Sequence, residues 1–284
     1  IDTLPVEMQL EIYSHRTYAQ HAELADKIQS TALGETKAQS TALGETIELR
    51  TRTMARDGVR VPQDCRTLKA AVKLVESNDR LTTIVVGKGE HVVVHHRKGG
   101  QLKINSVMKI VGDPEVPKEG IVVVGGIRFE EGIPGNCHLQ HLTLRQAKGT
   151  GVFGWSSFTM EDVLVAQCGD TGVFAYGTGV VGRCTNVEVR KCGGSGVVAY
   201  KGASITLIGA KTKVHQNCTN GDSDEYGLKV HGSSSSTIQL VSTLTKEQVS
   251  TDNGGGGNWG VLRGADINQI KTISQAEFTA LLEK

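Results

Sequence analysis

The chain has 284 residues, and 31 lysine and arginine side chains balance 30 aspartate and glutamate side chains for a net charge of +1. This balance gives no electrostatic reason to expect nucleic acid or an anionic membrane as a partner. No apolar run is long enough to span a bilayer, and the 35 glycines follow no Gly-X-Y period, so they indicate many tight turns rather than collagen.

The six cysteines are best explained as reduced, buried thiols. None of them forms a Cys-x-x-Cys pair or has the histidine partners that a zinc site needs. The sequence shows no secretory signal, and free thiols are typical of reducing compartments, so we expect an intracellular, cytoplasmic protein. Because the first residue is Ile1 and a leader could have been removed, secretion stays open.

Residues 1–56 form a polar, helix-prone zone with an internal duplication. The stretch QSTALGET occurs at Gln29–Thr36 and again at Gln39–Thr46. A step of ten residues is too short for a solenoid unit, so the duplication indicates a loosely packed segment. We therefore predict a helical extension here.

The first residues of this extension, TLPVEMQLEIYS, resemble the first helix of an F-box. The matching positions are Leu4, Pro5, Glu7, Met8, Glu11 and Ile12. The resemblance ends at Ser14, because no second and third F-box helix follows. It implies a substrate adaptor whose first helix binds the linker protein of a ubiquitin ligase.

Residues 57–245 have a different pattern, in which one helix precedes a series of strands. Apolar residues at helical spacing predict an amphipathic helix through Leu68, Ala71, Val72 and Val75, and a strand follows at Ile84–Val86. Later apolar runs have strand length and end at glycine, asparagine, aspartate or proline. No further helical periodicity separates them, which argues against alternating βαβ units.

A repeated phrase then identifies the architecture. Gly-Val-x-small-aromatic occurs as GVFGW, GVFAY and GVVAY, and the repeat glycines Gly151, Gly172, Gly196 and Gly227 follow one another at steps of 21, 24 and 31 residues. A period of this size with about three short strands per unit is typical of a parallel β-solenoid, in which each coil buries its face on the next.

Strand alternation within the phrase separates an inner from an outer face. The valines and small residues line the core, and small or sulfur-containing residues (Ala147, Cys168, Cys192, Asn217) stack inside one turn. Equivalent residues of successive coils lie about 4.8 Å apart. The outer face is therefore predicted to carry a stacked ladder of rings, which we call the aromatic ladder: Phe153, Trp155, Phe174, Tyr176, Tyr200 and His231.

Two interpretations of the aromatic ladder remain open. It binds a protein or a glycan, or it is covered by residues 1–56, by the glycine-rich tail or by a loop. In a second outward column, Glu188 is expected to form a surface ion pair with Arg190 or Arg145.

The stretch from Asp57 to Glu115 resembles the opening of right-handed parallel β-helix proteins of the pectin-lyase-like type. The resemblance rests on Val61-Pro62-Gln63-Asp64, Thr67-Leu68, Ala71-Val72, the segment Gly87–His91 and Ile110-Val111-Gly112. It implies a helix that caps the first coil. Proteins of this fold are either carbohydrate-active lyases, epimerases, esterases and hydrolases or non-catalytic binding modules.

The segment DEYGLKVHG at Asp224–Gly232 distantly resembles the signature of alginate epimerases and is the candidate catalytic segment. Asp224, Tyr226 and His231 are its weak catalytic candidates. The position of the expected aspartate holds Lys229, so the base is missing. The acidic loop Gly221–Glu225 has oxygen ligands suited to Ca²⁺ but lacks the spacing of a calcium hand, and a solvated loop is favoured. No other metal or cofactor is expected.

Residues 246–284 are predicted to form a glycine-rich linker and a terminal helix. Ser274 and Glu277 make a capping box, and Phe278, Leu281 and Leu282 form a small apolar face.

Together these patterns predict an all-β, right-handed parallel β-helix with an N-terminal capping helix and short terminal helices. The predicted function is a non-enzymatic recognition scaffold that binds a protein or glycan along the aromatic ladder, as a substrate adaptor of a ubiquitin ligase. The alternative is a polysaccharide lyase, epimerase or hydrolase that acts near Asp224–His231.

Overall fold

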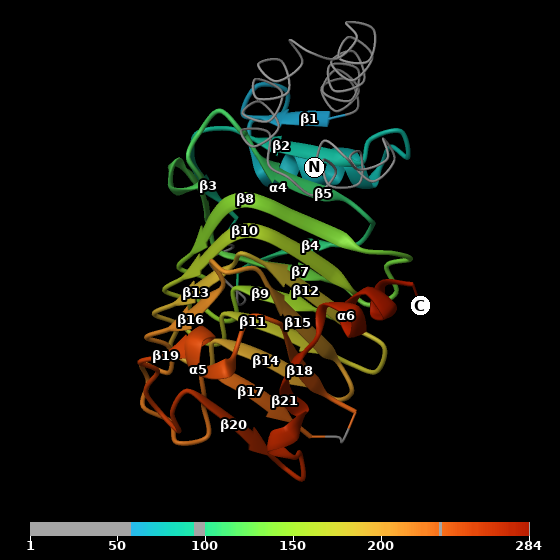
Figure 1. The fold of residues 1–284 in the computed structure, drawn as a ribbon. Helices are drawn as coiled ribbons and strands as arrows, with labels where there is room; N and C mark the ends of the chain where they lie inside the picture. The colour runs from blue at the N-terminus through green and yellow to red at the C-terminus, as the bar shows by residue number, and fades with distance from the viewer. Residues whose placement is uncertain (1–57, 94–99, 233–234, 284) are drawn as a thin grey trace, which may run out of the picture.

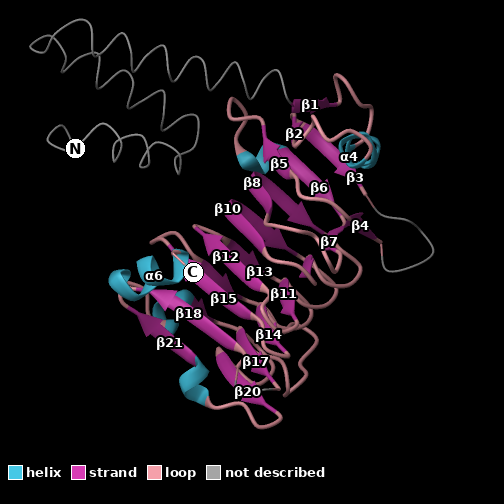
Figure 2. Ribbon diagram, turned by 90° about the vertical axis from the view of Figure 1, so that its right-hand side faces the viewer, coloured by secondary structure: helices cyan, strands magenta, loops and turns pink. Residues whose placement is uncertain are grey.

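The computed structural model describes residues 58–93, 100–232 and 235–283 of the chain. These residues wind into two sheets in which every strand pair is parallel, and successive coils stack along one axis (Figures 1 and 2). The predicted parallel β-helix is therefore confirmed. The predicted extension, with Leu4, Pro5, Glu7 and Ile12, lies outside the described residues.

The larger sheet, sheet A, has 14 strands and forms two sides of the coil. Its main path consists of β1 (Gly58–Val61), β2 (Thr83–Val86), β5 (Lys109–Gly112), β8 (Cys137–Arg145), β10 (Phe158–Ala166), β12 (Val181–Thr185), β15 (Ser204–Ile208), β18 (Thr237–Val241) and β21 (Ile270–Ile273). The second side consists of β3 (Gly89–Val92), β6 (Ile121–Val124), β13 (Glu188–Arg190), β16 (Lys213–His215) and β19 (Ser250–Thr251), which pair with each other or with the second halves of β8 and β10.

The smaller sheet, sheet B, has seven strands and forms the third side. In spatial order they are β4 (Gln101–Ile104), β7 (Gly126–Phe129), β9 (Val152–Gly154), β11 (Val173–Tyr176), β14 (Val197–Tyr200), β17 (Leu228–His231) and β20 (Trp259–Leu262). Each coil thus contributes about three short strands, as the repeat length indicated.

Corners of the coil are made by residues in the left-handed backbone region. Within β8 and β10 the corner falls at His141 and Asp162, with φ of 52° and 50°, and one coil later at Asn186, also 52°. A second set of such residues (Gln146, Gln167, Lys191, Gln216, Asp252) precedes the turn into sheet B. Polar side chains tolerate this conformation better than β-branched ones do.

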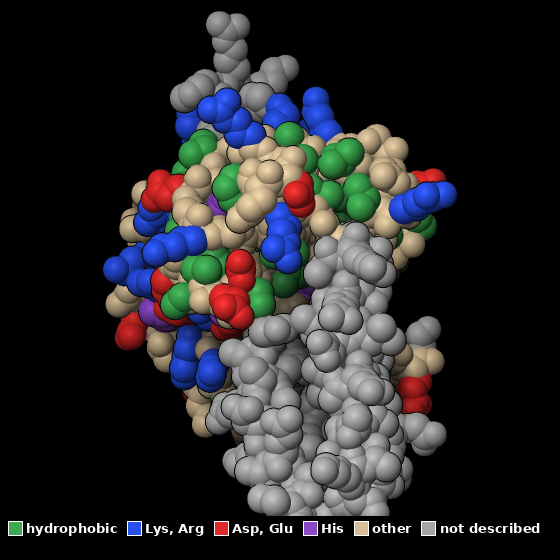
Figure 3. Space-filling model, turned by 90° about the horizontal axis from the view of Figure 1, so that it is seen from above, with side chains coloured by type: hydrophobic (Ala, Val, Ile, Leu, Met, Phe, Trp, Pro, Cys, Tyr) green, Lys and Arg blue, Asp and Glu red, His purple; other side chains and the backbone are tan. Residues whose placement is uncertain are grey.

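The first coil is capped by the predicted helix, α4 (Leu68–Glu76). Its N-cap is Thr67, whose hydroxyl accepts a hydrogen bond from the amide of Ala70. The side chains expected to face the core are all buried: Leu68, Ala71, Val72 and Val75. Viewed from above, over this end, the described acidic and basic side chains are interspersed with apolar ones (Figure 3).

The C-terminal part of the chain extends the solenoid beyond the predicted boundary at residue 245. Where a glycine-rich linker was expected, β19, β20 and β21 add a further coil that pairs with β16, β17 and β18. These short strands were not predicted because a glycine run is typical of a linker. Two short helical segments belong to this part of the chain: α5 (Lys246–Val249) before β19 and η2 (Ile267–Gln269) before β21. A third, η1 (Lys118–Gly120), lies earlier, between β5 and β6.

The terminal helix α6 (Gln275–Leu282) begins at the predicted capping box of Ser274 and Glu277. It lies on the outer face of sheet A, where Phe278 packs with Val241 and Ile273 (Figure 1). Leu281 and Leu282 stay exposed, so only Phe278 of the three predicted apolar residues is buried.

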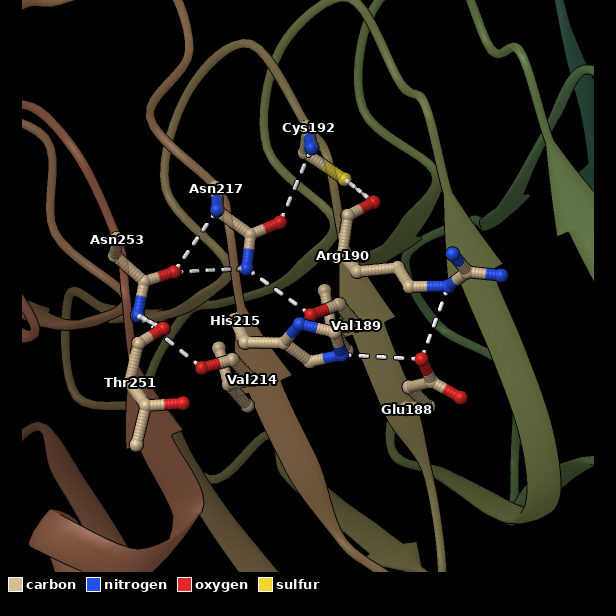
Figure 4. A network of polar contacts seen from close by, with 9 residues as sticks. All are labelled: Glu188, Val189, Arg190, Cys192, Val214, His215, Asn217, Thr251 and Asn253. Atoms are coloured by element: carbon tan, nitrogen blue, oxygen red, sulfur yellow. Dashed lines mark hydrogen bonds and ion pairs between the residues drawn. The ribbon is translucent and has the colours of Figure 1, made fainter.

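The internal stack of small and polar residues is confirmed and continues one coil further than predicted. We call Cys168, Cys192, Asn217 and Asn253 the inner ladder. The amide of Asn217 accepts a hydrogen bond from the backbone N–H of Cys192 (3.1 Å) and donates to the carbonyl of Val189 (3.0 Å) and to Asn253 (3.1 Å) (Figure 4). The cysteines are buried and free, so this ladder joins neighbouring coils by packing and hydrogen bonds.

The outward column beside this ladder carries the expected ion pair. Glu188 accepts from Arg190 at 2.9 Å and from His215 of the next coil at 3.0 Å (Figure 4). Arg145 instead pairs with Glu90.

Candidate recognition surface

The six rings of the aromatic ladder lie together on the outer face of sheet B. The strand register aligns Phe153 with Phe174, and Tyr176 with Tyr200 and His231, as the repeat predicted. The residues that alternate with the rings point inward and are fully buried, among them Val173, Ala175 and Ala199. Each ring of the ladder is partly buried. The sequence alone therefore located this surface.

Each ring packs against a ring of a neighbouring coil. Phe153 and Phe174 stack with centroids 4.9 Å apart and planes 10° apart, and Tyr200 stacks on His231 at 4.4 Å and 20°. Between these two stacks, Trp155 approaches Tyr176 at 4.2 Å. The rings therefore use much of their face area on each other, in a continuous cluster that spans four coils.

Two cationic side chains lie over the rings. The guanidinium of Arg128 is 5.6 Å from the ring centroids of both Phe153 and Trp155. The amine of Lys201 is 5.5 Å from the ring of Tyr176 and 5.7 Å from that of Tyr200. Cation–π attraction thus holds two positive charges against the ladder.

Neither cation belongs to the predicted aromatic ladder, although the sequence contains a signal for Arg128. Gly126 precedes Gly151 by 25 residues, so the phrase Gly126-Ile127-Arg128 belongs to the same repeat. The structure confirms this, because Arg128 is aligned with Phe153. Lys201 directly follows Tyr200 in the chain, in a turn with a φ of 50°.

The ladder also contains polar atoms without a partner among the described residues. The indole Nε1 of Trp155 and the imidazole Nε2 of His231 are buried and make no hydrogen bond. Trp155 borders a shallow hollow of about 320 Å³, whose other lining residues include Ile133, Ser157 and Val180.

At the far end of the ladder, one column is covered. Val198 and Lys229 follow Phe153 and Phe174 in register, but both are buried. Lys229 donates to Glu225 at 2.9 Å, and Glu225 also accepts hydrogen bonds from the backbone and side chain of Ser195. The loop that carries Glu225 therefore lies over Val198 and Lys229. At these two positions the outer face of sheet B is covered, as the second interpretation of the aromatic ladder expected.

Asp224 lies near enough to His231 to affect its charge, but no hydrogen bond joins the three catalytic candidates. The ring of His231 stacks on Tyr200, and burial, assisted by Lys229 and Arg263, lowers the pKa of its imidazole. The ring of Tyr226 is packed so closely against Gly256 and Gly260 that a Cβ at either glycine would lie within 2.4 Å of it. Asp224 is exposed in the acidic loop.

Within the acidic loop, Glu225 is committed to protein contacts. Burial opposes its ionisation, but the hydrogen bonds from Ser195 and Lys229 outweigh burial and lower its pKa. In the part of the chain that the structure describes, no three His, Cys, Asp or Glu side chains gather closely enough to hold a metal ion.

A separate group of titratable residues lies on the outer face of sheet A. His138 forms a 2.6 Å hydrogen bond with Thr159, while Asp162 accepts from Lys118 at 2.6 Å and bonds to His141 at 2.7 Å. Between them, burial and then the charge of Asp162 raise the pKa of Glu161 to about 7. These contacts fasten the loop of η1 to the corner of the coil, since His141 also bonds to a carbonyl of that loop, at Val116.

The chain matches no protein-family model, and no similar curated protein or solved structure was found. Among the described helices, none has the length and apolar character that crossing a membrane requires.

Proposed function

We propose that this chain is a recognition scaffold that binds a protein along the aromatic ladder. The observation that carries the proposal is the continuous cluster of six partly buried rings with two cations lying over them. Tryptophan, tyrosine and arginine are the side chains that contribute most to binding at protein interfaces, and they do so when they cluster. Aromatic side chains fixed by a rigid sheet also lose little conformational entropy on binding.

A protein partner fits this surface better than a glycan does. A sugar ring binds to the open face of an aromatic ring, whereas the stacked pairs Phe153–Phe174 and Tyr200–His231 offer mainly their edges. A peptide can use the ring edges and the hollow beside Trp155, which has room for a side chain. The enzymatic alternative is less well supported, since Lys229 stands where a base is needed and is itself paired with Glu225.

The proposal is tested by placing a photo-crosslinking amino acid at Phe174, in the middle of the ladder. The matched control has it at Arg183, which lies on the outer face of sheet A, in a strand of the same solenoid, and is partly buried like Phe174. After exposure to a cell extract, we expect protease-sensitive adducts from position 174 that disappear when Trp155→Ala and Tyr176→Ala are added. Adducts that resist protease and yield to glycosidases would instead establish a glycan, and equal adducts at both positions would refute a specific surface.

The role of ubiquitin-ligase adaptor is part of this proposal and rests on the F-box-like start. Leu4→Ala together with Pro5→Ala should abolish co-purification with a ubiquitin-ligase linker protein and leave the crosslinks at position 174 unchanged. Unaltered co-purification, or none with the parent chain, would show that the likeness carries no function. In the enzymatic alternative, the chain cleaves or epimerises a polyuronate, and Asp224→Asn and His231→Ala reduce that turnover.

A further inference from the structure

The charges around the aromatic ladder are unbalanced in favour of cations. Lys103 and Arg128 share one carboxylate, that of Glu130, at 3.1 Å each. Lys201 and Arg263 are exposed and form no ion pair with any described residue. The carboxylate of Glu225 is already neutralised by Lys229. Two exposed acids near the ladder form no ion pair with a described residue: Asp224, which lies near His231, and Glu131, which precedes the hollow beside Trp155.

The two cations that lie on the rings are positioned in advance. Arg128 lies at the level of β7 and Lys201 follows β14, three strands further along sheet B. At about 4.8 Å per strand, they are separated by on the order of 14 Å along the axis. An extended peptide covers that distance in about four residues. Cations held over the rings lose less conformational freedom when they pair with a carboxylate than freely moving ones do.

We propose that the segment that binds the aromatic ladder is an extended acidic peptide, with apolar side chains against the rings and carboxylates opposite Arg128 and Lys201. This inference rests on the proposed function. Single-stranded nucleic acid is a poorer fit, because it needs open ring faces on which bases stack, and the ring faces here are largely taken up by one another.

The experiment is a selection of random linear peptides, displayed on phage, against the full chain. Peptides that also bind the variant Trp155→Ala/Tyr176→Ala are removed, so that only ladder-dependent binders remain. We expect these to be enriched in aspartate and glutamate, at a separation of about four positions. Ladder-dependent peptides without acidic enrichment would overturn this inference and leave the proposed function standing. If no ladder-dependent peptide were enriched, both would be overturned.

Binding of the best acidic peptide is then measured by fluorescence anisotropy with charge-reversed variants of the chain. Lys201→Glu should weaken its binding by on the order of tenfold, and added salt should weaken the binding to the parent chain. The control is Lys191→Glu, because Lys191 is also exposed and also has left-handed backbone, with a φ of 56°, but lies at another corner of the solenoid. An equal loss with both variants, or none with Lys201→Glu, would refute the assigned position of the carboxylates.

Discussion

The inner ladder and the aromatic ladder are built by the same stacking of coils but differ in how far their polar groups are satisfied. Asn217 is 1% exposed, and its amide makes hydrogen bonds to three partners on two neighbouring coils. Trp155 and His231 instead keep a buried nitrogen without a partner. A stacked column can thus satisfy its polar groups inside the solenoid or leave some of them unsatisfied on its outer face, and the difference follows from which side of the strand it occupies.

The largest effect is expected from the inner ladder. Asn217→Leu leaves the backbone N–H of Cys192 buried without an acceptor and removes the bond to Asn253. We expect a loss of about 3 kcal/mol in the free energy of unfolding, measured by urea denaturation. Asn220→Leu is the control, because Asn220 is exposed and the one hydrogen bond of its side chain to a described residue is 3.4 Å long. Equal losses in the two variants would contradict the distinction.

The next effect tests how tightly the coils close around the inner ladder. A Cβ at Gly172 would lie 2.3 Å from a methyl of Val189 and 2.7 Å from the carbonyl oxygen of Gly196. Gly172→Ala should therefore cost about 2–3 kcal/mol of stability through overpacking. At Gly149 an added Cβ meets no atom within 4 Å, so Gly149→Ala should leave the melting temperature almost unchanged. A similar decrease in both would show that packing is not the cause.

Val173 and Phe174 are neighbours in β11, so truncating each of them compares the stability contributed by the inner and the outer side of one strand. Val173 is fully buried and Phe174 is only partly buried. Although phenylalanine is the larger side chain, Val173→Ala should cost about 2 kcal/mol and Phe174→Ala about 1 kcal/mol, because only the first leaves a closed cavity. Chemical denaturation of both variants measures this, and the reverse order would mean that the aromatic ladder is a structural element.

The smallest effect concerns the outer face of sheet A and depends on pH. The unfolded chain releases the proton of Glu161 near pH 4.5, whereas the folded protein holds it until about pH 7. The folded state binds more protons in this window, so stability falls as the pH rises through it. Glu161 is partly exposed, so we expect Glu161→Gln to raise stability at pH 8, relative to pH 5, by only about 1 kcal/mol.

The control for this measurement is Glu188→Gln, because Glu188 is held by Arg190 and His215. Its replacement removes favourable ion pairs, so it should bring no gain at pH 8. A gain of equal size in both variants would show that general charge reduction, rather than the burial of Glu161, sets the pH dependence.

Within the repeats, sequence patterns predicted individual strand partners. The pairing of Phe153 with Phe174 and of Tyr176 with Tyr200 followed from the positions of these residues in the repeated phrase. This works because a parallel solenoid pairs residues one period apart, so the period itself sets the register. The last coil was not predicted, because β19 consists of only Ser250 and Thr251 and the glycines at 254–257 replace the repeated phrase ahead of β20.

The sequence by itself determined the parallel β-helix, the capping helix α4, the start of α6 and the six rings of the aromatic ladder. These features depend on period, alternation and capping, which are properties of neighbouring residues. Only the tertiary structure decided that the rings pack on one another, that Arg128 and Lys201 lie over them, that Glu225 covers Lys229, and that Glu161 lacks an ion-pair partner among the described residues. Those contacts join side chains from different coils, and rotamer choice, burial and local charge set them after the backbone has formed.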